Sequence, residues 1–150
     1  MPAIPQVTKQ AARTYVPAVG QLIVGGQVVE GTSGGRIQKA GAASTRWLGV
    51  AVTDARAPED VNTALASPGT VDGRPLVNFA PFPANVTVVS SGTEVPVVYA
   101  AAANFGDALI CAANGQVTPA GATPDARQII GKCTAPNGVG IGAVGLMRIL

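Results

Sequence analysis

The chain has 150 residues, of which only 12% are Asp, Glu, Lys or Arg, and it carries a net charge of +2 with no histidine. Soluble domains usually contain about twice this share of charged residues, so we expect another protein chain to cover much of the surface. The few, scattered basic residues argue against a nucleic-acid partner. No apolar run approaches the ~18 residues of a membrane-spanning helix. A chain of this length is most simply one domain.

Residues 1–17 are expected to form an extended N-terminal arm that precedes a single β-rich domain, residues 18–150. Three prolines in this segment oppose a long helix, and no amphipathic period anchors it. Lys9, Arg13 and Tyr15 give the segment two charges and one amphipathic ring. A frayed terminus is the alternative interpretation. The first residues have no basic start and no apolar core, so no signal peptide is predicted and the protein is expected to be made in the cytoplasm.

Strands follow from about Gly20. The runs 22–24 and 27–30 flank Gly25-Gly26, which predicts a hairpin. Further strands are predicted at 36–39 and 47–53, where the single tryptophan, Trp47, is favoured as a core residue over a binding platform.

Residues 55–84 form an irregular, proline-rich loop. Asp72-Gly73 predicts a turn inside it, and residues 59–66 could make one or two helical turns. Loops longer than about 15 residues are unusual in compact domains and are often functional. This loop is therefore a candidate contact surface.

Short strands and tight turns resume after this loop. Pro96 cannot donate to a β-ladder, so the strand around it is expected to lie at a sheet edge or to carry a bulge. Asn114-Gly115 predicts a hairpin with positive φ at both residues, and Asn137-Gly138 predicts another turn. The strands predicted here are 86–90, 93–101, 108–112, 116–118, 129–134 and 142–150. The pattern predicts an all-β fold, either a small barrel or a sandwich.

Two stretches about 80 residues apart follow one template. Residues 35–42 continue to Trp47-Leu-Gly-Val, and residues 115–122 continue to Ile129-Ile-Gly-Lys. We expect each copy to begin with a glycine-led strand, 20–24 in the first and 106–110 in the second. A repeat of glycines and short apolar runs specifies a fold rather than a catalytic site.

The residues offer no catalytic constellation. Without histidine, neither a Ser-His-Asp nor a Cys-His nucleophile can form, and no phosphate-binding glycine loop leads from a strand into a helix. Cys111 and Cys133 lie on predicted strands, where they are either two buried thiols or a disulfide across neighbouring strands. Two cysteines alone cannot make a standard zinc site. No enzyme activity, cofactor, metal or small-molecule substrate is expected.

The motifs Gly106-Asp-Ala-Leu-Ile, Asn114-Gly-Gln-Val-Thr-Pro-Ala-Gly and Ile130-Gly-Lys-Cys, with the closing Gly145-Leu-Met-Arg-Ile, resemble the capsid decoration proteins of tailed double-stranded-DNA bacteriophages. These are also called cement or head-stabilising proteins, and those of phages that infect actinobacteria look most similar. The first copy, ending in Leu48-Gly-Val-Ala-Val-Thr-Asp, is similar too.

This resemblance implies a small β-rich structural virion protein, often a homotrimer, on the outer surface of the capsid. It would stabilise the assembled shell by bridging neighbouring subunits of the major capsid protein. The expected contacts with the capsid or with other protomers are Lys9, Arg13 and Tyr15 of the arm, together with the 55–84 loop. The alternatives are another non-enzymatic β-module: a head fibre or tail component, or a carbohydrate-binding domain.

Overall fold

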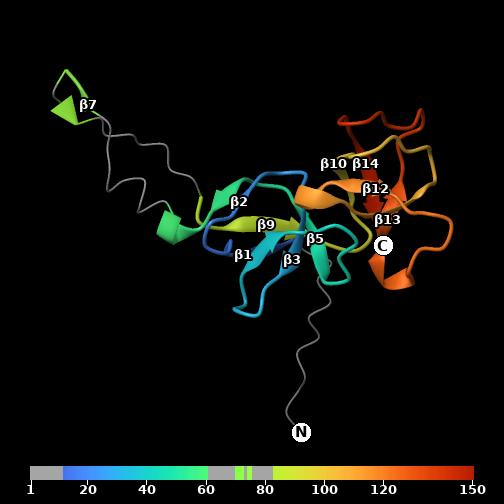
Figure 1. Cartoon of the computed structure of the whole chain (residues 1–150), viewed down its shortest axis with the longest axis horizontal. Coiled ribbons are helices and arrows are strands. Elements are labelled where there is room, and N and C mark those ends of the chain that lie inside the picture. Colours follow the sequence, from blue (N-terminus) through green and yellow to red (C-terminus); the bar gives the residue numbers. More distant parts are fainter. Residues whose placement is uncertain (1–11, 61–69, 73, 76–82) are drawn as a thin grey trace, which may run out of the picture.

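The computed structural model describes residues 12–60, 70–72, 74–75 and 83–150. Their strands form two five-stranded antiparallel sheets and two two-stranded sheets (Figure 1). The predicted all-β fold is confirmed. Of the two architectures predicted, the sandwich-like one is correct, because the sheets pack together and are not closed into a barrel.

The first large sheet belongs to lobe 1, the described residues of 12–90, and has the order β1-β9-β5-β3-β4. A two-stranded sheet of β2 and β6 accompanies it. A separate hairpin pairs β7 with β8 through a turn at Asp72, whose φ of 50° agrees with the predicted turn. The strand bounds are β1 (Arg13–Tyr15), β2 (Leu22–Ile23), β3 (Val28–Gly31), β4 (Ile37–Lys39), β5 (Trp47–Ala51), β6 (Ala55–Arg56), β7 (Thr70–Val71), β8 (Arg74–Pro75) and β9 (Val86–Val89).

The second large sheet belongs to lobe 2, residues 93–150, and has the order β10-β14-β13-β11-β12. Short 3-10 turns at Ala113–Gly115 and Ala126–Gln128 connect its strands. The strand bounds are β10 (Glu94–Val98), β11 (Ala108–Cys111), β12 (Val117–Pro119), β13 (Ile129–Cys133) and β14 (Val144–Ile149).

The two lobes are structural copies of each other. Strands β1, β3, β4, β5 and β9 occupy the same sheet positions as β10, β11, β12, β13 and β14. The copies share even their irregularities. The β3–β5 register shifts between Val29 and Glu30, and the β11–β13 register shifts between Leu109 and Ile110. The sequence repeat is therefore a tandem duplication of one five-stranded unit.

The start of the first copy differs from the sequence prediction. The strand that matches 106–110 is 26–30, not 20–24. Gly26 N donates to Ala51 O at 2.7 Å, and its counterpart Gly106 N donates to Cys133 O at 2.8 Å. The 20–24 segment instead leads into β2, which pairs with β6. For the same reason the predicted hairpin across Gly25-Gly26 is wrong: the turn is present, but the strands beside it pair with other strands.

Two local predictions in lobe 2 are confirmed. The β11–β12 hairpin turns through Asn114 (φ 59°) and Gly115 (φ 71°), which both have positive φ as predicted. Strand β10, which contains Pro96, lies at a sheet edge. The backbone nitrogen of Pro96 faces away from β14, because the hydrogen bonds to β14 fall on odd-numbered residues at both ends of β10: Ile149 N donates to Thr93 O, and Tyr99 N donates to Ala143 O.

Each large sheet curls toward closure at one point. In lobe 1, Ala18 N donates to Ile37 O at 2.8 Å, so the chain leaving β1 lies against the outer edge of β4. In lobe 2, Ala100 N donates to Val117 O at 2.8 Å and covers β12 in the same way. One bridge in each lobe covers the edge without forming a ladder, which leaves less backbone open to pairing with other chains.

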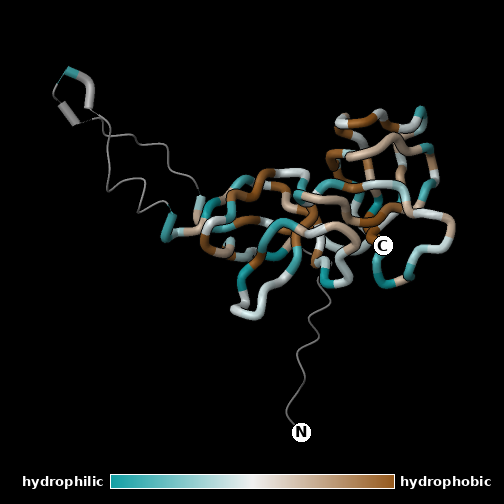
Figure 2. The backbone as a smooth tube through the Cα atoms, viewed as in Figure 1, coloured by the Kyte–Doolittle hydropathy of each residue, from teal (hydrophilic) through white to brown (hydrophobic). Residues whose placement is uncertain are grey.

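The core consists of two clusters. One lies within lobe 1 and consists of Ile23, Val29, Ile37, Ala51, Ala55, Val86 and Val88, with Tyr15 packed against it. The larger cluster fills lobe 2 and extends into lobe 1 through Val28, Ala40 and Val50. Hydrophobic residues accordingly run along the strands and through the region where the lobes meet, whereas hydrophilic residues mostly occupy turns (Figure 2).

Candidate functional site

The chemistry-bearing side chains form no catalytic centre in the part of the chain that the structure describes. No group of three or more Cys, Asp or Glu residues there could hold a metal ion. No helix among the same residues has the length and hydrophobicity needed to cross a bilayer. The search for a functional site therefore turns to surfaces.

Both cysteines are free and buried. Of the two alternatives predicted from the sequence, the buried thiols are confirmed and the disulfide is wrong. Burial, with a smaller contribution from the charge of Glu30, raises the pKa of the Cys111 thiol to about 12. The thiol therefore remains protonated at neutral pH and is a poor nucleophile. Cys111 and Cys133 act as small core hydrophobes.

Glu30 is the one buried charged residue described, with 6% of its surface exposed. Gln38 Nε2 donates to its carboxylate at 2.8 Å, Ser44 Oγ donates as well, and Arg46 lies 3.9 Å away. Burial raises the pKa of this carboxyl, but the hydrogen bonds outweigh burial and hold the pKa below its usual value of 4.5. The cluster satisfies a buried charge at the junction of the lobes, so its role is structural.

The described base of the proline-rich loop is anchored to lobe 1. Arg36 makes a bidentate ion pair with Glu59, at 2.8 and 2.5 Å, and the pKa of Glu59 falls to about 2, mainly through this hydrogen bond. Gly20 N donates to Asp60 Oδ2 at 2.8 Å. Arg56 N donates to Pro83 O at 3.1 Å and joins the two ends of the loop.

The duplication shows that this loop is an insertion. It connects β6 to β9 in lobe 1. In lobe 2, the backbone bridge between Ala103 and Val139 corresponds to the β2–β6 pairing of lobe 1. A turn at 140–143 then leads directly into β14. The fold therefore does not need the loop. Residues 58–60 are helical; the rest of the predicted helical turn, 61–66, lies outside the described residues, as does most of the loop's middle.

The predicted contact residues of the arm have different locations. Lys9 lies outside the described residues. Arg13 and Tyr15 belong to β1, which pairs with β9 at the edge of the lobe 1 sheet. Arg13 is exposed, whereas Tyr15 is half-buried and packs on the lobe 1 core. The last residues of the expected arm are thus part of the folded sheet.

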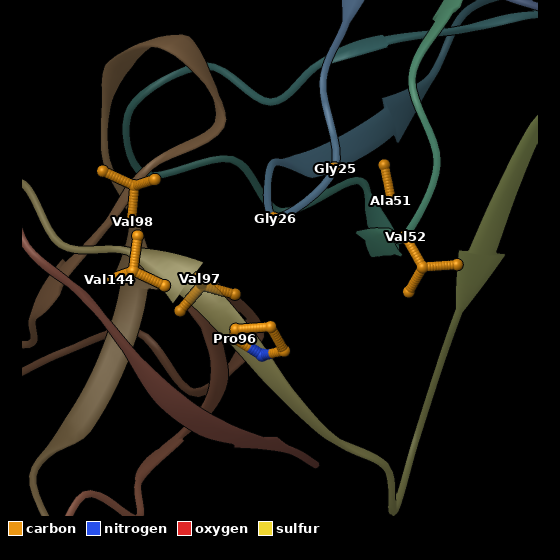
Figure 3. Close-up of a pocket in the computed structure, with 8 residues that line it drawn as sticks. All are labelled: Gly25, Gly26, Ala51, Val52, Pro96, Val97, Val98 and Val144. Carbon is orange, nitrogen blue, oxygen red and sulfur yellow. The ribbon is translucent and has the colours of Figure 1, made fainter.

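A pocket of about 190 Å³ lies where the lobes meet. Lobe 2 contributes Pro96, Val97, Val98 and Val144, and these face Gly25, Gly26, Ala51 and Val52 of lobe 1 (Figure 3). Every lining side chain is apolar, so the pocket offers no side-chain group for acid–base chemistry. It is a surface depression suited to apolar contact.

Large apolar side chains are exposed beside this pocket. Val52 is 45% exposed, Val144 66% and Leu146 42%. Monomeric soluble proteins seldom expose contiguous apolar patches unless these serve an interaction. Local sequence patterns did not reveal this set, because Val52 follows β5 of lobe 1 whereas Val144 and Leu146 belong to β14 of lobe 2. Only the strong alternation in β14, with Met147 and Ile149 buried, is visible in the sequence.

No family model matches the sequence, and no curated protein sequence matches it. Among solved structures, the fold is similar to the crystal structure of the head fiber gp8.5 N base in bacteriophage phi29, with a TM-score of 0.58. The likeness is one of fold. Sequence identity is 13%, and the match covers 93% of this chain and 94% of that chain. It therefore includes both lobes together rather than one five-stranded unit.

Proposed function

We propose that this chain is a non-enzymatic structural protein of a tailed-phage virion. It binds the outer surface of the assembled capsid shell and stabilises the shell by bridging neighbouring major capsid protein subunits. The observation that carries the proposal is the fold, which matches a phage head fiber base across both lobes. The resemblance of the glycine and turn motifs to capsid decoration proteins supports the same class.

The composition and surface are consistent with this role. A chain with 12% charged residues and exposed valines and leucines needs protein partners to cover its surface. The proposed partners are the major capsid protein and further copies of this chain, which the resemblance gives as a homotrimer. The proposed shell contacts are the arm with Lys9, Arg13 and Tyr15, and the 55–84 loop.

Shell binding would stabilise by mass action, because the protein binds the assembled lattice and not the free subunit. Several copies, or several contacts of one copy, would add avidity to weak individual contacts. A loop that only one lobe carries is a reasonable place for such a contact, since the other lobe folds without it.

Co-sedimentation with expanded, undecorated capsids of the same phage tests the proposal. The full chain is expected to pellet with the capsids and to raise the temperature at which they release DNA. The variant Arg13→Glu is expected to bind more weakly, and the matched reversal Arg127→Glu in lobe 2 is expected to bind as the full chain does. A full chain that remains in the supernatant at all concentrations would refute the proposal.

A head fibre base is the second candidate, because the fold neighbour is one. A fibre base needs to bind the shell but does not need to stabilise it. Binding without any change in the temperature of DNA release would therefore favour the fibre base over the decoration protein.

A further inference from the structure

The outer face of β10 and β14 in lobe 2 carries an ordered set of exposed side chains. Three cross-strand pairs follow one another along it: Glu94 opposite Arg148, Pro96 opposite Leu146, and Val98 opposite Val144. The alternate residues of both strands point into the core, as Val97 and Met147 do with no exposed surface. The face therefore has a charged row at one end and two apolar rows beyond it.

Lobe 1 shows that the fold does not require these apolar residues. In lobe 1 the pair Thr14–Thr87 occupies the register position of Pro96–Leu146. One step farther along β14, Val144 corresponds to Asn85. Three of the four apolar positions of lobe 2 are thus polar in lobe 1, and the fourth, Val98, corresponds to Val16. The apolar rows of lobe 2 therefore need an explanation other than folding.

The apolar surface continues into the pocket between the lobes. Pro96, Val98 and Val144 line one side of it, and the exposed Val52 lies on the other (Figure 3). The contact surface thus extends beyond one sheet and includes a depression that an apolar side chain could enter.

A partner would contact this face rather than extend the sheet at the free edge of β10. Pro96 lies at the middle of that edge, at a position whose backbone N–H would point outward, and proline has no N–H to donate. The turn of lobe 1 also approaches it, since a Cβ added to Gly26 would lie 3.3 Å from Pro96 O. Both features oppose strand addition.

We propose that a second copy of this chain docks on this face through a two-fold contact. If the axis runs parallel to the strands and between β10 and β14, rotation exchanges the two members of every cross-strand pair. Glu94 then faces the partner's Arg148, Pro96 faces the partner's Leu146, and Val98 faces the partner's Val144. The face is thus complementary to itself in charge and in hydrophobicity, as an isologous interface requires.

The charges are available for such a contact. Within the described residues no ion pair joins Glu94 or Arg148 to another side chain, and both residues are exposed. The inference does not depend on the proposed virion function, because it concerns only copies of this chain. Three cross-strand pairs make up the face, and for a contact of so few side chains we expect a dissociation constant in the range of about 1 µM to 1 mM.

Sedimentation equilibrium of the full chain tests the contact first. The expected result is a reversible doubling of mass, from 14.9 kDa to twice that value for the single chain, or from trimer to hexamer for the proposed homotrimer. A chain that remains monomeric up to about 1 mM, the weakest affinity expected, would overturn the proposal. So would a trimer that never doubles in mass, because three copies cannot all pair through one two-fold face.

A charge-swap experiment tests the geometry. Glu94→Arg and Arg148→Glu each place like charges opposite one another in a homodimer, so each alone should weaken dimerisation about tenfold or more. Mixing the two variants restores opposite charges at both contacts and should give a heterodimer of wild-type affinity. The control Arg127→Glu, in the 3-10 turn at Ala126–Gln128 and outside this face, should dimerise as the wild type does. Failure of the mixture to associate would contradict the two-fold arrangement.

The double variant Val144→Asn, Leu146→Thr tests the apolar rows by giving lobe 2 the residues of lobe 1. We expect the dissociation constant to rise about tenfold or more while the urea midpoint of unfolding stays nearly unchanged, because both side chains are exposed. An unchanged dissociation constant would show that the contact lies elsewhere. If a charge reversal fails to fold, this variant still tests the contact.

Discussion

Gly35 and Gly115 occupy equivalent turns of the two lobes but have different surroundings. Both have positive φ, 73° and 71°. A Cβ on Gly35 would meet nothing within 4 Å, whereas a Cβ on Gly115 would lie 2.6 Å from Val28 O of the other lobe. Gly115 N also donates to Ala40 O at 3.0 Å, so this turn docks lobe 2 onto lobe 1.

Substitution of these two glycines by alanine should separate backbone strain from lobe docking. Gly35→Ala carries only the cost of positive φ, about 1 kcal/mol. Gly115→Ala adds a collision with backbone and should cost about 3 kcal/mol or more. The two free energies of unfolding, measured by urea denaturation, provide the comparison. Equal losses at the two sites would show that the Gly115 turn does not hold the lobes together.

Glu30 should make stability depend on acid pH. Its pKa is lowered in the folded protein, so its contribution is fully present above the unfolded value of about 4.5 and is lost as pH falls below that value. Glu30→Gln removes the charge and should lower the free energy of unfolding at pH 7 by about 1–3 kcal/mol. Urea midpoints of the wild type and of Glu30→Gln, measured between pH 7 and about pH 3, test this. The difference between the two midpoints should narrow as pH falls. A difference between the midpoints that does not change with pH would mean that the carboxylate charge is not the stabilising feature.

At the level of elements, β1 shows the limit of local pattern. Prolines oppose a long helix over residues 1–17, but composition cannot indicate that residues 13–15 pair with β9. That pairing depends on Tyr15, which packs on a core assembled from strands distant in sequence. Asn114-Gly115 and Pro96 were predicted correctly because their effects, positive φ and a missing N–H, are local.

Two N-terminal deletions should separate the strand from the residues before it. Deletion of residues 1–17 removes the β1–β9 ladder and the Tyr15 packing, and should lower the free energy of unfolding by about 2–4 kcal/mol. Deletion of residues 1–11 retains both. The prediction is that the longer deletion is the more destabilising by at least this amount, as measured by thermal and urea unfolding. Equal stability of the two truncated proteins would contradict it.

For the whole molecule, the larger core cluster determines whether the two lobes unfold cooperatively. It joins Val28, Ala40 and Val50 of lobe 1 to the interior of lobe 2. Each lobe alone would expose part of this cluster, so the lobes should unfold in one transition. Trp47 reports on the junction, since it packs on the cluster and its Nε1 donates to Arg127 O at 3.3 Å.

Unfolding followed by Trp47 fluorescence and by far-ultraviolet circular dichroism should therefore give coincident curves in urea. The variant Trp47→Phe should shift the midpoint of the dichroism curve downward without splitting it. Two separate transitions would show that the lobes are independent domains.

The all-β class, the proline-bearing edge strand, the positive-φ turns, the presence of a repeat and the lack of histidine could all be read from the amino-acid sequence. Each follows from the covalent character of particular residues and their spacing. Three features could be recognised only in the folded chain: where the first copy begins, that the proline-rich loop is an insertion, and which apolar side chains remain exposed. Those outcomes depend on which strands pair and which faces the lobes cover, and pairing between residues as distant in sequence as Arg13 and Val88 leaves no local signal.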